Sequence, residues 1–485
     1  MVRRELFRIR INGVKKFSVF FLAIALLAGC QTAPKWKPLD HTPVAPYPDK
    51  YWSKINQPEL LGWSSQKLGE AKAYADSIDT AAVMIVDDGV VVDAWGDITR
   101  KFQCHSMRKS LLSAMIGVQV EREKIDLAKS MEELGIDDSP PSLTPVEKQA
   151  TIGDLIKARS GIYHPALGES PAMRAMRPRR GSHPPGTYWY YNNWDFNALG
   201  TIFEQETETG IFEAFQRDFA EPMNMEDYNL EDCRYLTADY YGSPGFSHHR
   251  YYLFRMSARD LARFGLLFLR DGRWKDRQIV SRTWVQESTG AHSKVGLNSW
   301  YGYMWWSGTR GGLYPGVEVK GHCYTAAGWG GHRLIILPFR KLVVVHRVNT
   351  DRRFKRVSNG QIGRLLWHIL DAAGEKNIGE KPILEAANGV RLTGNRLKQT
   401  LTGCTVRTGR YTVKIPNDSR MEFWSGRKRF STAKWGVDGD KGWLKSKIMT
   451  GGRKVYLDFV LENDTLKWYD HDGTLDGKGR YIKDL

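Results

Sequence analysis

The stretch CHSMRKSLLSAMIGVQVERE, residues 104–123, decides the fold. Its apolar residues, among them Leu111 and Met115, recur at helical spacing, which predicts a buried helix that begins at or near Ser106. Lys109 then lies one turn later on the same face of that helix, so its amine can reach the serine hydroxyl. A serine hydroxyl becomes an effective nucleophile when a neighbouring base removes its proton. The stretch therefore predicts a helix that carries a reactive serine–lysine pair.

The spacing Ser-x-x-Lys is weak evidence by itself, because it also occurs at 64–67, 425–428 and 431–434. Only the copy at 106–109 follows two β-rich runs and opens a long apolar helix. A free lysine has a pKa of about 10.4, so burial or positive neighbours must lower it before the amine serves as a base. We therefore expect Ser106 to be the nucleophile, in a pocket that perturbs its lysine.

Strand and helix patterns flank this stretch on both sides. Residues 80–97 hold two β-rich runs around Asp88-Gly89, a strong hairpin signal. Further elements are expected at 65–78 and 257–269 (helices, the second capped by Ser257), 332–337 and 341–348 (strands) and 361–372 (helix). Residues 125–250 mix helices with loops rich in Pro, Gly and Arg. The chain is predicted to be an α/β protein, with an antiparallel sheet flanked by helices and a helical subdomain.

After about residue 389 the pattern changes to short alternating runs separated by Gly, Asp and Asn. The expected strands cover residues 410–415, 421–424, 443–448, 455–461 and 466–469. No helix is expected in this part. We predict a linker over 376–389 and a small all-β domain, a barrel or half-barrel, over 390–485.

Two further motifs follow the serine–lysine pair in order. Residues 185–193 read PGTYWYYNN, and residues 326–332 read AAGWGGH just before a predicted strand. Together the three motifs resemble the serine β-lactamase and penicillin-binding-protein superfamily, over about residues 60–375. Class C lactamases have Lys-Thr-Gly where this chain has Ala-Ala-Gly, so the resemblance is closest to the 6-aminohexanoate-dimer hydrolase and esterase-like branch. It implies a β-lactamase-like fold.

The resemblance also implies roles for individual side chains. Tyr191 would relay the proton to the leaving group beside Lys109, and Asn193 would position the substrate. A competing register of the Tyr-x-Asn motif gives Tyr190 the role of Tyr191. Ordinary aromatic packing is the alternative interpretation of this Tyr- and Trp-rich segment.

The strand motif is expected to complete the site through its backbone. By the register of the resemblance, the N–H of Trp329 joins that of Ser106 as an oxyanion donor. Gly328 and Gly330 would let a substrate lie close to the strand. A competing register of this strand motif instead aligns His322 with the His-x-Gly that some relatives have at this strand.

These residues predict a serine hydrolase that cleaves an ester or amide through an acyl-enzyme on Ser106. A β-lactamase or D-Ala-peptide hydrolase is the first alternative, which the missing lysine disfavours. An inactive lipoprotein that binds the cell envelope is the second. No spacing indicates a metal site, and no cofactor is expected. His105, His164 and His183 either tune the lysine, bind substrate or are structural, and the structural interpretation is the commoner one.

The N-terminus reads as an export signal. Residues 1–29 combine six basic residues with an apolar run that is short for a membrane span, and they end in Leu-Ala-Gly before Cys30. This resembles a bacterial lipobox, so Cys30 is predicted to be lipidated. Gln31 follows instead of aspartate, which favours the outer membrane facing the periplasm. Residues 30–59, rich in proline, are expected to form a tether.

The net charge suggests an anionic partner, and the cysteine content leaves the disulfide state open. The chain carries +17 and keeps +12 after residues 1–29, with 20 Lys/Arg and 11 Asp/Glu in residues 390–485. This basic end fits an anionic envelope polymer or lipid headgroups, or is only a solvated surface. No motif indicates nucleic acid. Cys104, Cys233, Cys323 and Cys404 can form disulfides in an exported protein or remain buried thiols.

Overall fold

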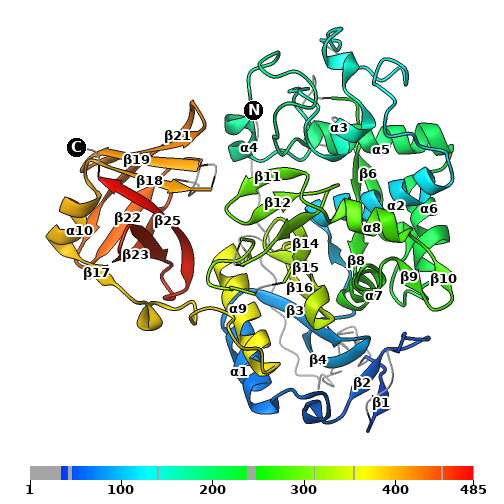
Figure 1. Ribbon diagram of the computed structural model, residues 1–485, viewed down its shortest axis with the longest axis horizontal. Helices are drawn as coiled ribbons and strands as arrows, with labels where there is room; N and C mark the ends of the chain where they lie inside the picture. Colours follow the sequence, from blue (N-terminus) through cyan, green and yellow to red (C-terminus); the bar gives the residue numbers. More distant parts are fainter. Residues whose placement is uncertain are drawn as a thin grey trace, which may run out of the picture. The chain divides into compact units, whose positions relative to one another are not determined.

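The computed structural model describes residues 34–41, 46–138, 141–237, 247–310, 312–319, 321–352, 355–409, 411–448, 450 and 452–483 (Figure 1). The predicted signal peptide and Cys30 lie outside these ranges. Among the residues it does describe, no helix is long and apolar enough to cross a membrane.

A ten-stranded sheet forms the centre of the first domain, in the order β1-β2-β4-β3-β16-β15-β14-β13-β12-β11. The strands are β1 (Lys37–Leu39), β2 (Ser53–Ile55), β3 (Thr80–Asp87), β4 (Val90–Gly96), β11 (Ser293–Gly296), β12 (Ser299–Tyr301), β13 (Trp306–Gly308), β14 (Cys323–Gly328), β15 (His332–Leu337) and β16 (Leu342–Val348). From β4 to β11 every neighbouring pair is antiparallel. The predicted hairpin is present, because Asp88 and Gly89 both adopt the positive φ that a tight two-residue turn requires.

Helices cover both faces of this sheet. On one face α1 (Ser65–Ser77) and α9 (Asn359–Ala372) lie side by side (Figure 1) over a core that includes Ile85, Ile335 and Val344. On the other face α2 (Arg108–Glu121) and α7 (Ala258–Leu269) pack on the alternate strand residues. The predicted cap is confirmed, since Ser257 Oγ accepts a hydrogen bond from the backbone of Asp260.

The same domain has further helices. They are α3 (Ile152–Ile156), α4 (Pro171–Met176), α5 (Asn193–Thr207), α6 (Ile211–Phe215) and α8 (Arg282–Ser288). Of these, α5, α6 and α8 contact α2. Short strands pair between them and the sheet: β5 (Phe102–Gln103) with β8 (Arg255–Met256), β6 (Arg234–Leu236) with β7 (Tyr251–Leu253), and β9 (Arg273–Trp274) with β10 (Arg277–Gln278). The predicted fold class, an antiparallel sheet flanked by helices with a helical subdomain, is confirmed.

The described part of the expected tether is folded, which corrects that expectation for residues 46–59. β2 extends the edge of the sheet and pairs in parallel with β1 and β4. Trp52, just before β2, is fully buried and donates its indole N–H to the carbonyl of Arg259. Proline content indicated an extended segment, but one buried tryptophan outweighs it, because burying its large apolar surface stabilises docking.

The C-terminal domain is a closed β-barrel. Its strands are β17 (Val390–Leu392), β18 (Cys404–Thr408), β19 (Tyr411–Asn417), β20 (Arg420–Ser425), β21 (Lys428–Asp438), β22 (Lys441–Lys445), β23 (Lys454–Glu462), β24 (Thr465–Tyr469) and β25 (Leu475–Lys483). The ring runs from β23 through β22, β21, β20, β19, β18 and β25 to β24, which pairs with β23 again. Closure satisfies the edge strands that a half-barrel would expose.

A helix inside this domain contradicts the expectation that the C-terminal part has none. α10 (Gly394–Leu401) places Leu397 and Leu401 in the barrel core, and both are fully buried. Two leucines four residues apart are too short a pattern to signal a helix in sequence. The four described cysteines are free thiols, which decides between the two possibilities left open above.

Candidate active site

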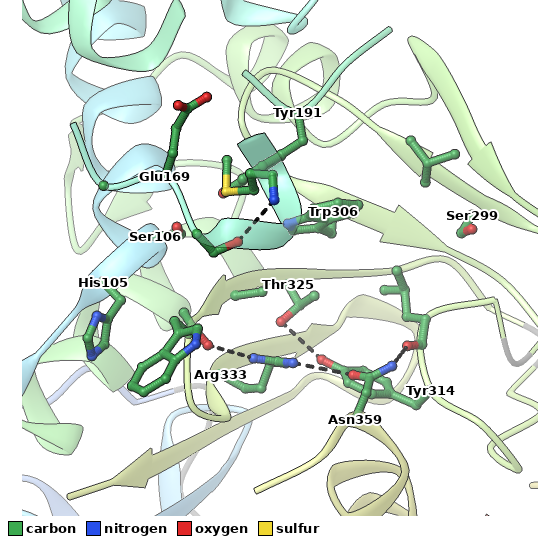
Figure 2. Close-up of a pocket in the computed structure, with 18 of the residues that line it drawn as sticks. His105, Ser106, Glu169, Tyr191, Ser299, Trp306, Tyr314, Thr325, Arg333 and Asn359 are labelled. Carbon is green, nitrogen blue, oxygen red and sulfur yellow. Dashed lines mark hydrogen bonds between the residues drawn. The ribbon is translucent and has the colours of Figure 1, made fainter. Parts of the chain in front are cut away.

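Ser106 lies in a single turn of 3₁₀ helix, η2 (His105–Met107), which runs directly into α2. The residue before it, His105, has φ 48°, a left-handed conformation that a side chain adopts only at some cost. This geometry brings the lysine of the next turn beside the serine: Lys109 Nζ lies 2.9 Å from Ser106 Oγ. Figure 2 shows Ser106 with its hydroxyl turned into the pocket, facing Tyr191.

Lys109 is buried among three oxygens. Its Nζ is hydrogen-bonded to Ser106 Oγ at 2.9 Å, to Tyr191 Oη at 2.8 Å and to Asn193 Oδ1 at 2.8 Å. The side chain is 1% exposed. Burial, and then the positive charge of Arg108, hold the pKa of Lys109 well below its usual value. The amine is therefore suited to act as a base rather than as a fixed cation.

Arg108 is a fully buried cation on the same helix. Its guanidinium carbon lies 3.9 Å from the ring centroids of both Tyr251 and Tyr252, and its Nη2 donates to Asn197 Oδ1 at 2.7 Å. Its Nε and Nη1 are buried without hydrogen-bond partners. No carboxylate in the described ranges forms an ion pair with it. Because cation–π contacts leave the charge intact, its field reaches Lys109.

Asp195 is a fully buried carboxyl group. It lies in the first turn of α5, where its Oδ1 accepts hydrogen bonds from Ser160 Oγ at 2.6 Å and from Asn192 Nδ2 at 2.7 Å. Burial raises the pKa of Asp195 well above its usual value. Burial therefore disfavours the charged form of this carboxyl group.

The structure distinguishes the two tyrosine registers. Tyr191 Oη is bonded to Lys109, and burial raises the pKa of Tyr191 above its usual range. Tyr190 is buried and donates its hydroxyl to the carbonyl of Met173 at 2.8 Å. The register with Tyr191 is therefore the one that brings a phenol to the serine–lysine pair.

Ser106 opens into a pocket of about 760 Å³. Aromatic side chains line much of it: Trp189, Tyr191, Tyr251, Trp306, Trp329 and Tyr411. The opposite wall is β14, with Thr325, Ala327 and Gly328. A Cβ on Gly328 would lie 2.7 Å from the carbonyl oxygen of Cys104, so only glycine allows β14 to approach the nucleophile turn this closely.

The edge of β14 is open toward this pocket. β13 pairs with β14 only as far as the Trp306–Thr325 pair, so the strand continues past it to Gly328 without that neighbour. On its other side β14 stays paired with β15 up to the Gly328–His332 pair. An unpaired strand edge offers backbone donors and acceptors to a ligand.

Not every predicted site residue lines the pocket. Trp329 does, although its side chain is 60% exposed, whereas Asn193 lies behind the wall and contacts Lys109. Gly330 has φ 85° in the turn between β14 and β15, and this described residue is outside the pocket lining. His322 is also outside it, and its ring is tilted against that of Tyr324 with 5.6 Å between the ring centroids.

Sequence reasoning missed several pocket residues. Arg333 on β15 donates to the carbonyl oxygens of Gly328 and His332 and to Asn359 Oδ1 on α9, as Figure 2 shows in part. Tyr411 comes from the barrel, where its ring packs 5.7 Å from that of Phe430. Neither residue belongs to a local motif, so only the folded chain brings them to Ser106.

The other three Ser-x-x-Lys copies are separate from this pocket. Ser64 caps α1 by accepting from the backbone of Lys67, and the Lys67 ammonium pairs with Asp371 at 2.8 Å. The copies at 425–428 and 431–434 lie on barrel strands β20 and β21.

Residues 67–365 match the family model described as Beta-lactamase. The chain belongs to the beta-lactamase family. Members of this family are generally serine hydrolases, which supports a serine hydrolase activity in broad terms. A comparison with the curated proteins found no match.

Solved structures similar to this beta-lactamase family member include three from different organisms. A proposed 6-aminohexanoate-dimer hydrolase from Bacillus anthracis is 21% identical (TM-score 0.48), with 62% of this chain and 81% of that chain covered. An octameric penicillin-binding protein homologue from Pyrococcus abyssi is 15% identical (TM-score 0.48), with coverage of 86% and 99%. A penicillin-binding protein from Bacillus halodurans is 14% identical (TM-score 0.46), with coverage of 62% and 99%.

Proposed function

We propose that the protein cleaves an ester or amide through an acyl-enzyme on Ser106. The observation that carries this proposal is the buried Lys109 amine, bonded at once to Ser106 and Tyr191. As a neutral base the amine takes the serine proton while the hydroxyl oxygen attacks the carbonyl carbon. Tyr191 and Lys109 then pass that proton to the leaving group, and water releases the acyl group by the same route in reverse.

The oxyanion of this reaction needs donors that are in place beforehand. We assign the backbone N–H of Ser106, at the start of its helix, and that of Trp329, directly after β14. Both residues line the pocket, and Gly328 keeps the two segments close. Removing one such donor typically costs an enzyme about 10²–10³-fold in kcat.

The Ala-Ala-Gly sequence of β14 favours an ester or amide over a β-lactam. Ala327 presents a methyl group to the pocket where class C lactamases have a polar residue, and no lysine stands at position 326. The aromatic lining around Ser106 suits acyl or leaving groups with apolar surface. β-Lactams and D-Ala peptides are therefore the second candidate substrates, to be included as comparisons in any screen.

Labelling with a fluorophosphonate tests the nucleophile directly. We expect the chain from Gln31 onward to form a covalent adduct, because a fluorophosphonate reacts with an activated serine. Mass spectrometry of the modified peptides should place the adduct on Ser106. The serines of the other copies, Ser64, Ser425 and Ser431, serve as internal controls. An adduct on one of these instead, or none in a folded protein, would contradict the proposal.

Tyr411 should limit the size of the substrate, because it brings a barrel side chain into the pocket wall. We expect Tyr411→Ala to raise kcat/KM for an ester with a bulky acyl group by about threefold or more, relative to the acetyl ester. The ratio of the two values for wild type and variant is the measurement. Phe430→Ala, which removes the ring behind Tyr411, should move the ratio the same way but less. An unchanged ratio in both variants would exclude the barrel from substrate selection.

A further inference from the structure

A second hollow lies on the outer face of the barrel, across β18, β19, β20 and β25. It encloses about 570 Å³. We call it the barrel groove and define it by Thr405, Arg407, Thr412, Lys414, Trp424 and Arg427. None of its lining residues belongs to the pocket at Ser106.

Strand register explains how these side chains come together. Val406 and Val413 point into the barrel core, so their neighbours along each strand point outward. Arg407, Thr412 and Trp424 are direct cross-strand neighbours in one row over β18, β19 and β20. In the next row of the same face, Thr405 on β18 is paired with Lys414 on β19. Side chains of residues paired in this way lie within contact distance of each other.

The groove carries uncompensated positive charge. Arg407, Lys414 and Arg427 are all exposed, and within the described barrel residues no carboxylate forms an ion pair with any of them. The neighbouring carboxylate of Glu422 is bound by two arginines that do not line the groove. Three clustered cations without counterions raise the local potential and attract an anionic ligand.

Trp424 gives the groove an oriented aromatic face. Its indole N–H donates to Glu422 Oε2 at 3.2 Å, which holds the ring in place. Lys414 Nζ lies over the ring at 5.3 Å from its centroid, and the guanidinium carbon of Arg429 lies over it at 6.0 Å, so positive charge adjoins the aromatic surface. Thr412 places a hydroxyl group beside this ring.

We propose that the barrel groove binds an anionic polysaccharide. The C–H face of a sugar ring packs on an indole ring, its acidic substituents meet the cations, and its hydroxyl groups meet the hydroxyl of Thr412. The described residues that are large, apolar and strongly exposed all lie outside the groove, whereas a membrane-binding surface would insert such side chains into lipid. This proposal does not depend on the chemistry at Ser106.

Binding to polygalacturonate, a linear polyanionic sugar, tests the proposal with the chain from Gln31 onward. We expect saturable binding that neutral dextran does not show. Trp424→Ala, which leaves the net charge unchanged, should weaken it at least about fivefold. The triple variant Arg407→Gln/Lys414→Gln/Arg427→Gln should weaken it at least about tenfold.

A matched variant distinguishes binding at the groove from attraction to the general positive charge of the barrel. Lys434→Gln/Lys445→Gln/Lys447→Gln removes the same charge from exposed barrel positions outside the groove, so binding should stay within about twofold of wild type. Equal losses in both triple variants would overturn the proposal. So would binding that is insensitive to Trp424→Ala, or groove-dependent binding to phosphatidylglycerol vesicles or single-stranded DNA without binding to polygalacturonate.

Discussion

Lys109→Met should lower the rate of fluorophosphonate labelling of Ser106 at neutral pH by about 10²–10⁴-fold, the range that a positioned general base contributes. Methionine keeps the length and apolar stem of lysine but cannot accept a proton. It also leaves Tyr191 and Asn193 without their shared donor, so the loss measures the whole arrangement around the amine. Labelling rates at several probe concentrations, followed by intact-mass spectrometry, give the rate constants of wild type and variant that are compared.

Two controls make this result specific. Lys434→Met changes the lysine of another Ser-x-x-Lys copy, on β21, and should label at the wild-type rate. Ser106→Ala sets the baseline without a nucleophile. If Lys109→Met labels within threefold of wild type while its melting temperature is unchanged, a different group activates Ser106 and the proposed mechanism is wrong.

Arg108→Met should shift the pH dependence of labelling toward higher pH. Only the neutral amine of Lys109 accepts a proton, so labelling rises as the pH climbs through the pKa of Lys109. The positive charge of Arg108 lowers that pKa, and its removal lets the pKa rise. At a pH below both the old and the new pKa, the rate falls about tenfold for each unit of the shift.

Charge and packing at this position are separated by Arg108→Lys, which keeps a cation between the two tyrosine rings. The lysine variant should retain a profile close to wild type, whereas Arg108→Met should not. Lys109 is hydrogen-bonded to Ser106, Tyr191 and Asn193, and burial raises the pKa of Tyr191 whereas it lowers the pKa of Lys109. Parallel profiles for all three proteins would show that Arg108 only fills space.

Local patterns predicted the parts of the fold that local physics determines. The Asp88-Gly89 turn requires positive φ at two adjacent residues, and the apolar period of residues 104–123 requires a buried helix. The spacing of Ser106 and Lys109 follows from the same helix, so their contact was also predictable.

Contacts between distant segments were not predictable in this way. Nothing near Tyr411 in the sequence indicates that it reaches a pocket more than three hundred residues earlier in the chain, at Ser106. Arg108 has the composition of an exposed helix residue, and its burial depends on two tyrosines of β7. The tether expectation for residues 46–59 was wrong for the same reason, since Trp52 finds its site on α7 only after folding.

The stretch of β14 beyond Thr325, which β13 leaves unpaired on one side, has a consequence for selectivity. A substrate laid along it would form part of the sheet, so recognition would fall on repeating peptide units rather than on particular side chains. An amide group offers both a hydrogen-bond donor and an acceptor to the strand edge, whereas an ester group offers only an acceptor. A polyamide bound at Ser106 would then be held along β14 over several of its units, whereas an ester would be held only at the bond that is cleaved.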